Sequence, residues 1–144
     1  MYDTVLVPTD GGDAAADGVE HAFDLAAAHD ASVHVLSVAA PGMETVAIGG
    51  GSVGSMAAAN QAASERTADE VVAAAEERGI EATRSVESGL PHRVILSHVR
   101  RHDADVVVMG THGRTGITRA LTGSVTERVI RHADVPVIAV RAQD

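Results

Sequence analysis

Apolar and polar residues follow two alternating patterns along this chain. Short apolar runs bounded by Gly, Pro or Asp predict buried strands, because a strand in a parallel sheet is covered on both faces. The predicted strands are residues 4–8, 33–38, 80–86, 106–109 and 135–140. Between them, apolar residues spaced three or four apart predict amphipathic helices. The predicted helices are residues 13–30, 55–78, 91–101 and 124–133.

The ends of these helices carry their own signals. Asp13 follows a Gly–Gly turn and is expected to cap the first helix. Gly79 is expected to stop the second helix, and Pro91 to open the third as its first residue. The apolar face of the first helix is formed by Val19, Ala22, Phe23 and Ala26.

Strands that alternate with helices predict an α/β fold with one open, five-stranded parallel sheet and helices on both faces. Right-handed crossovers and the short chain favour the strand order 3-2-1-4-5, flavodoxin-like or adenine-nucleotide α-hydrolase-like. The segment 80–86 alternates polar and apolar residues, which suits an edge strand. At 144 residues the chain is expected to form a single domain, 1–144.

The most informative segment for function is 110–124, GTHGRTGITRALTGS, between the fourth strand and the last helix. Its glycines permit tight turns and close approach to a ligand, and hydroxyl and guanidinium groups are interleaved with them. A strand, a Gly-rich loop and a helix N-terminus together form a typical phosphate site. In the expected strand order this segment faces Pro8, Thr9 and Asp10 across the switch point. The alternative interpretation of segment 110–124 is a flexible surface loop, and the alternative role of Asp10 is to cap a helix.

Two common nucleotide motifs do not fit this segment. A Walker A loop needs a lysine, and the chain has none. A dinucleotide fingerprint needs GxGxxG after the first strand, whereas here GxxGxxG follows the fourth. The last 45 residues hold 7 Arg against 5 acids, in a chain of net charge −9, so the segment lies in the least acidic part of the sequence. That bias suits a site that takes an anion.

The motif G-x2-G-x9-G-[S/T] runs without a gap from Gly110 and Gly113 to Gly123–Ser124. With it, the chain resembles the nucleotide-binding branch of the universal stress protein family. The opening VLVPTDGG and the ending GSVTERVIRHADVPVIAV are also similar to that family, so the resemblance covers the whole chain.

The resemblance implies that ATP, or another adenine nucleotide, occupies the crevice, and that its phosphates can carry Mg²⁺ or Mn²⁺. Pro8, Thr9 and Asp10 would line the adenosine side, with Asp10 accepting a bond from the ribose or lying near a metal. Val38 would meet adenine through its backbone, and Met109 and Gly110 would form the floor under the ribose. His112, Gly113 and Arg114 would border the phosphates; for His112 an exposed loop histidine is the alternative. The groups donating to the phosphates at the helix N-terminus would be Gly123, Ser124, Val125 and Thr126.

The implied function is an ATP-dependent switch or sensor in a stress response, with slow hydrolysis at most. The alternative is a dimeric interaction module of the same family that binds no nucleotide. The apolar segment 135–140 is expected at the edge of the sheet, where a strand invites pairing with another chain. The resemblance also implies a homodimer through this strand, and a core strand covered on both faces is the alternative.

The composition limits partners and location. Tyr and Phe occur once each and Trp is absent, so binding of nucleic acid by base stacking is not expected. The chain has no cysteine, which excludes disulfides, thiol catalysis and Cys-ligated zinc. No apolar run reaches the roughly 18 residues of a membrane helix. The N-terminus lacks the basic region of a signal peptide, so we expect a cytoplasmic protein.

All 11 basic residues are arginine, against 20 acidic ones. An acidic surface without lysine predicts adaptation to high salt and hence a halophilic archaeal source. A high-GC genome, which favours Arg and Ala codons, is the alternative explanation.

Two further patterns have weak support. Residues 50–54, GGSVG, fit the GxSxG pattern of hydrolases but lie in a Gly-rich loop of a small chain. His98 and His102 have a spacing that metals use on helices, but no HExxH glutamate accompanies them. We therefore expect these histidines to belong to a solvated helix end beside Arg100 and Arg101.

Overall fold

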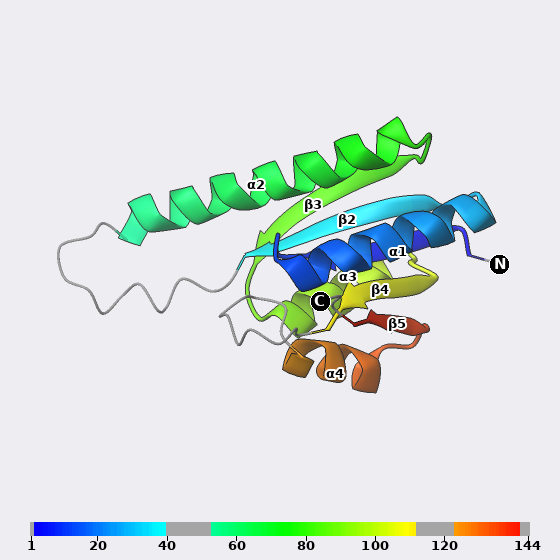
Figure 1. The fold of residues 1–144 in the computed structure, drawn as a ribbon. Coiled ribbons are helices and arrows are strands. Elements are labelled where there is room, and N and C mark those ends of the chain that lie inside the picture. Colours follow the sequence, from blue (N-terminus) through cyan, green and yellow to red (C-terminus); the bar gives the residue numbers. More distant parts are fainter. Residues whose placement is uncertain (1, 40–52, 112–122, 142–144) are drawn as a thin grey trace.

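The computed structural model describes residues 2–39, 53–111 and 123–141. Strands and helices alternate through these residues (Figure 1). Their bounds are β1 Thr4–Thr9, α1 Asp13–His29, β2 Ser32–Ala39, α2 Val53–Glu77, β3 Ala82–Ser88, α3 Pro91–Arg101, β4 Val106–Gly110, α4 Gly123–His132 and β5 Val137–Val140. Each predicted element is present, with ends that differ from the predicted ones by up to two residues.

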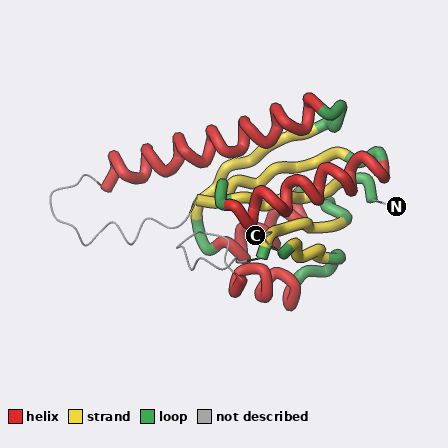
Figure 2. The backbone as a smooth tube through the Cα atoms, in the orientation of Figure 1, coloured by secondary structure: helices red, strands yellow, loops and turns green. Residues whose placement is uncertain are grey.

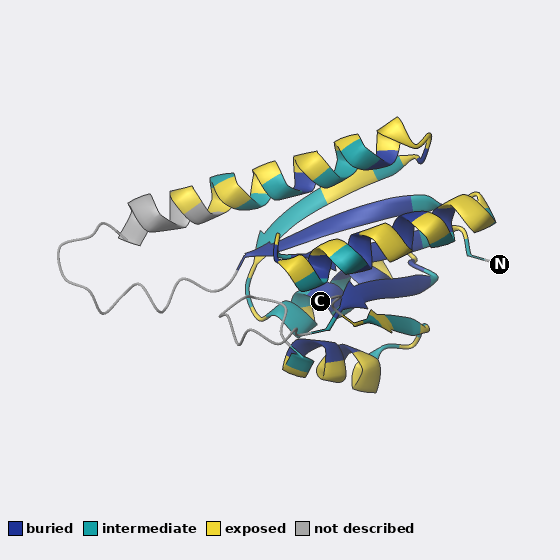
Figure 3. Cartoon of the chain, in the orientation of Figure 1, coloured by how far each residue is buried: buried dark blue, intermediate teal, exposed yellow. Residues whose placement is uncertain are grey.

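The strands form one five-stranded sheet in the order β3-β2-β1-β4-β5, and every pair is parallel. The predicted α/β fold and strand order are therefore confirmed. β1, β2 and β4 are almost fully buried, whereas β3 and β5 are partly exposed along their length (Figure 3). The segments expected to be edge strands thus lie at the two edges of the sheet.

Two hydrophobic cores lie on opposite faces of the sheet, because successive side chains of a strand point to opposite sides. One core joins Val5 and Val7 of β1 to the apolar faces of α1 and α2. The other joins Leu6 of the same strand to α3 and α4. All four apolar residues predicted for the face of α1 are buried in the first core. Figure 2 shows the long α2 lying along the half of the sheet that holds β2 and β3.

The helix ends agree with two predictions and correct a third. Pro91 opens α3 as its first residue, and Gly79, with φ of 74°, follows the end of α2. Asp13, however, is not the cap of α1: it lies inside the first turn, and Gly12 takes the N-cap position without a side-chain bond. The nearby carboxylate of Asp10 accepts the N–H of Gly12 instead.

β1 also continues one residue past its predicted end at Pro8. Pro8 pairs with Leu36 of β2, and Thr9 pairs with Ser37. The ladder between β1 and β4 ends at Leu6 and Val107, before the proline, which has no N–H to donate. Proline therefore shortens the pairing on one side of β1 without ending the strand.

None of the helices in the described ranges combines the length and the apolar character that a membrane crossing requires.

Candidate functional site

The carboxyl ends of the three central strands lie at one edge of the sheet. β1 ends at Thr9, β2 at Ala39 and β4 at Gly110. Parallel pairing places these ends side by side, with Thr9 opposite Ser37. The strand order reverses between β1 and β4, which is where open α/β sheets bind ligands.

The turn after β1 is stabilised by its own side chains. The hydroxyl of Thr9 accepts the N–H of Gly11 at 3.2 Å, and Oδ1 of Asp10 accepts the N–H of Gly12 at 2.8 Å. Gly11 has φ of 81°, a conformation that favours glycine. Thr9 is buried, whereas Asp10 is partly exposed. The turn thus fixes the Asp10 carboxylate at the edge of the sheet, where solvent or a ligand can reach it.

Gly110, the first glycine of the motif, has a packing role that the sequence did not reveal. A Cβ atom at this position would lie 2.0 Å from the carbonyl oxygen of Ala14, in the first turn of α1. Gly18, one turn further along α1, approaches the same strand end: its Cβ would lie 2.8 Å from the amide nitrogen of Gly110. The backbones of α1 and β4 are therefore in direct contact, and this contact positions the turn that carries Asp10.

The N-terminus of α4 faces the same strand end. The hydroxyl of Thr126 donates to the carbonyl oxygen of Gly110 at 3.2 Å and is buried. Val125 is also buried, in the core between α3, α4 and the sheet, whereas Ser124 is exposed. The first N–H groups of a helix have no partner inside it, and they favour negative charge. The family resemblance implies a phosphate contact for Thr126, and in the structure its hydroxyl also links α4 to the end of β4.

Pro8, Val38 and Met109 are buried, and the side chains of Val38 and Met109 belong to the same core as α4. They can therefore meet a ligand at this edge mainly through backbone groups. His112, Gly113 and Arg114 lie outside the described residues, as do residues 40–52 with the first three positions of the GGSVG pattern. Thr111, the last described residue before this gap, donates its N–H to the carbonyl oxygen of Val140 at 2.8 Å.

A cavity of about 350 Å³ opens between α1 and α2 beside the β1 turn. Its wall contains Thr9 and Gly11 from the turn and apolar side chains such as Phe23 and Val71. Three acidic residues also line it: Asp17, Glu20 and Glu70. Their negative charge makes this cavity unfavourable for a phosphate group.

The structure corrects the expectation for His98. The residue lies on α3 but is buried against the sheet, with 2% of its surface exposed, rather than at a solvated helix end. His102, one turn further on, is exposed as expected. The partner that covers His98 is Glu87 of β3, an edge-strand residue whose role the helix pattern did not indicate.

With this geometry in place, comparison with known proteins identifies the family. Residues 1–141 match the Universal stress protein family. The universal stress protein MJ0531 of Methanocaldococcus jannaschii is 32% identical over 141 residues, covering 98% of this chain and 83% of that protein.

Solved structures share the fold. The structure of the M. jannaschii protein MJ0577 superposes with a TM-score of 0.78 at 23% identity, covering 100% of this chain and 99% of that one. A universal stress protein of Archaeoglobus fulgidus, solved in complex with dAMP, gives a TM-score of 0.68 at 21% identity, covering 96% and 97%. The family match and the full-length relative together show that this chain belongs to the universal stress protein family.

Proposed function

We propose that this protein binds ATP at the carboxyl edge of its sheet and acts in the cytoplasm as a nucleotide-dependent switch or sensor in a stress response. The observation that carries the proposal is the meeting of three groups at one edge: the β1 turn with Asp10, the end of β4 at Gly110, and the N-terminus of α4. A carboxylate for a ribose and a helix N-terminus for phosphates are the two recognition elements that an adenine nucleotide needs.

Each element has a distinct task in this proposal. Asp10 accepts a bond from a ribose hydroxyl or lies near a Mg²⁺ or Mn²⁺ ion on the phosphates, and the backbone of Val38 meets adenine. Gly123, Ser124 and the residues after them donate N–H groups to the phosphates. The dAMP bound by the A. fulgidus protein supports an adenine nucleotide as the ligand class. AMP, ADP and cyclic nucleotides carry the same recognition groups as ATP.

Hydrolysis by such a site is expected to be slow. The main catalytic contribution that these groups offer is electrostatic stabilisation of the phosphates by the N-terminus of α4. The hydroxyl of Thr126, the buried one in this first turn, already donates to Gly110. We therefore propose a nucleotide-binding protein whose nucleotide-bound form is recognised by a partner, rather than an enzyme with rapid turnover.

Titration calorimetry with ATP in high salt tests the proposal, with Asp10→Asn as the variant and Asp13→Asn as its matched control. Asp10→Asn keeps the acceptor for Gly12 but removes the charge, so we expect ATP affinity to fall about tenfold or more, the value of a charged hydrogen bond. Asp13 is exposed in the first turn of α1, and its substitution should leave affinity within about twofold.

Gly113→Val adds a test of the loop, since it should abolish ATP binding while circular dichroism shows an intact fold. No heat at millimolar ATP with folded wild-type protein would sink the proposal. It would also favour the alternative, a dimeric interaction module that binds no nucleotide. Mass spectrometry of the freshly purified protein should identify a copurified adenine nucleotide if the proposal holds.

The edge position of β5 supports a homodimer as part of the proposal. The carbonyl oxygen of Pro136 accepts a bond from Val107 of β4, and that of Val140 accepts one from Thr111, just after β4. The backbone groups of Val137 and Ala139 therefore face away from the sheet. Among the described residues no strand pairs with this outer edge, and a largely apolar edge of this kind is suited to pairing with a second copy of the same strand.

A further inference from the structure

A polar strip lies on the face of the sheet that α3 covers. His34 of β2 and Thr83, Ser85 and Glu87 of β3 point to this face, since they contact one another or α3. The alternate residues of β3 point to the other face, where Arg84 pairs with Asp69 of α2. The His34 end of the strip lies away from the proposed nucleotide site, because His34 is in the first half of β2, five residues before its carboxyl end, whereas Glu87 at the other end of the strip pairs with Val38.

His34 is held between two hydroxyls. Its Nδ1 lies 2.7 Å from the hydroxyl of Thr83 and its Nε2 lies 3.0 Å from that of Ser85. The side chain is buried, and burial, together with the nearby His102 and His98, lowers its pKa to about 4. The imidazole is therefore neutral at physiological pH, which is the form that offers a lone pair.

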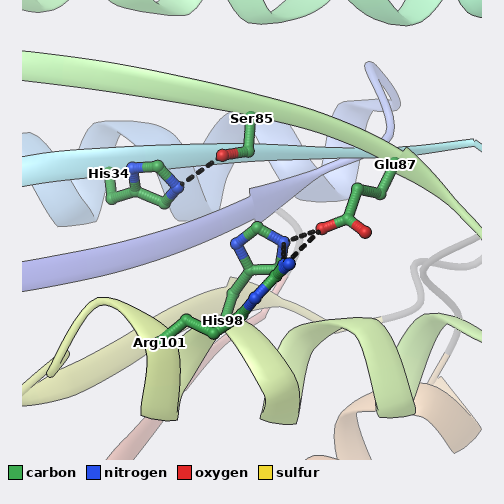
Figure 4. Close-up of polar contacts among 5 residues, drawn as sticks. All are labelled: His34, Ser85, Glu87, His98 and Arg101. Atoms are coloured by element: carbon green, nitrogen blue, oxygen red, sulfur yellow. Dashed lines mark hydrogen bonds and ion pairs between the residues drawn. The ribbon is translucent and has the colours of Figure 1, made fainter.

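His98 has one ring nitrogen engaged and one without a partner. Its Nε2 contacts a carboxylate oxygen of Glu87, which Arg101 also approaches at 3.2 Å (Figure 4). The Nδ1 atom is buried, and no hydrogen-bond partner for it is found among the described residues. A buried polar nitrogen without a hydrogen-bond partner destabilises the folded state, which suggests that the Nδ1 atom of His98 binds a ligand.

His102 completes the group from the end of α3. Its ring stacks on that of His34 with centroids 3.9 Å apart and lies 5.2 Å from that of His98. One nitrogen from each of the three rings lies within 4.8 Å of the other two. Two of the rings are buried and His102 is exposed, so solvent reaches the group from one side.

We propose that His34, His98 and His102 bind a divalent transition-metal ion of the kind that prefers imidazole, such as Zn²⁺. In this site the buried Nδ1 of His98 is a ligand, and its Nε2–H donates to Glu87. A carboxylate that accepts the second N–H of a metal-bound histidine is the usual way in which proteins orient such a ligand. The hydroxyl of Thr83 orients His34 by accepting its Nδ1–H. The Nε2 atom of His34 then binds the ion instead of contacting the hydroxyl of Ser85.

The distances place the rings close to, but not in, ligand geometry. An ion at the centre of three nitrogens that lie within 4.8 Å of one another would be at most about 2.8 Å from each, whereas Zn–N bonds are about 2.0–2.1 Å. Each nitrogen must therefore move by at most about 0.7 Å. The rings must also tilt out of their stack so that their lone pairs converge. His102, exposed at the end of its helix, has room for that change, and water can take the fourth position.

The chemistry separates this site from a phosphate-bound Mg²⁺ or Mn²⁺. Those ions prefer oxygen ligands, whereas three imidazole nitrogens suit Zn²⁺, Ni²⁺, Cu²⁺ or Co²⁺. The proposal is therefore independent of nucleotide binding, and either one can fail without the other. The competing explanation is a purely structural stack of three rings with no affinity for ions.

The experiment uses tag-free, chelator-treated protein and Co²⁺, whose absorption bands report coordination by nitrogen, followed by competition with Zn²⁺. The variant is His102→Ala, which removes an exposed ligand and should not disturb folding. The control is His21→Ala, which removes an exposed histidine from α1, outside the cluster. We expect one ion per chain at micromolar or tighter affinity, at least tenfold weaker binding in His102→Ala, and no change in His21→Ala.

A second readout is thermal unfolding with and without Zn²⁺. The ion should raise the Tm of the wild type and of His21→Ala, and should raise it much less in His102→Ala, because only an intact site binds the folded state preferentially. Absence of stoichiometric binding in the wild type, or equal affinity in His102→Ala, would overturn the proposal and leave the three rings as a structural stack.

Discussion

Gly110→Ala gives the sharpest test of how α1 and β4 fit together. The added methyl group would lie 2.0 Å from the carbonyl oxygen of Ala14 and 2.5 Å from its carbonyl carbon. An ordinary carbon–oxygen contact is above 3 Å, so α1 must withdraw by more than 1 Å. The atoms in the way are helix backbone, not the end of a flexible side chain that could turn aside.

The size of the effect follows from what the withdrawal disturbs. α1 is attached to the sheet by a row of buried residues that includes Val19, Ala22 and Phe23, and all of them would lose contact. Overpacking a tight core costs about 1–3 kcal/mol, occasionally more, and a clash between backbones belongs at the upper end. For a domain of this size a loss of about 3 kcal/mol lowers the Tm by about 10 °C.

Gly79→Ala is the matched control. Gly79 has φ of 74°, and no atom of the described residues lies within 4 Å of an added Cβ, so the backbone conformation is what opposes the change. That conformation costs about 1–2 kcal/mol for alanine, and the Tm should fall by about half as much as in Gly110→Ala. Urea and thermal unfolding followed by circular dichroism measure both variants. If Gly110→Ala were no less stable than Gly79→Ala, the contact between α1 and β4 would be wrong.

Two further predictions concern the surface. Ala139→Pro removes an outward N–H of β5, so light scattering should show a shift from dimer to monomer. The control Ala139→Val keeps this N–H and should remain a dimer. An unchanged molecular mass for the proline variant would refute dimer formation through β5. Partial burial and the charges of Arg128, Arg93 and His132 lower the pKa of His92, so the unfolded state takes up its proton first as the pH falls below about 6.5. Stability from this group is present above that pH and is lost below it. The Tm of His92→Gln, measured with a chelator present, should therefore fall less between pH 7 and pH 5 than the Tm of the wild type. The same fall of Tm in both proteins would show that His92 binds its proton equally in the folded and unfolded states.

Local signals in the sequence predicted the fold because each one acts over a few residues. The apolar runs mark the strands, and Pro91 and Gly79 mark two helix ends, through properties of single residues and their neighbours. The strand order then follows from connection rules that depend on element lengths alone. The failed prediction for Asp13 has the same origin. Two acids near the start of α1 were equivalent in sequence, and only the path of the turn shows that Asp10 bonds to Gly12.

The rest depends on contacts between distant residues. Arg100 and Arg101 follow His98 closely in the sequence, which predicts an exposed position, but Glu87 lies across from His98 on β3 and covers it. His34 comes from a third element, 64 positions earlier in the chain than His98. A pattern read along one helix contains no information about which strand side chains face it. Alternation of polar residues in segment 80–86 was the one available signal, and it indicated an edge strand but not a partner.

The two explanations for Gly110 change how the nucleotide proposal should be weighed. The close approach of Ala14 requires glycine at this position whether or not a ligand binds, because the clash is internal to the fold. A glycine here is thus weaker evidence for a nucleotide than its place in the motif suggests. The proposal rests more firmly on Asp10, whose turn leaves a carboxylate at the edge of the sheet, and on the N-terminus of α4. Because the Asp10 carboxylate also accepts the N–H of Gly12 inside its own turn, Asp10→Asn is the decisive variant: it keeps an acceptor for that bond and removes the charge.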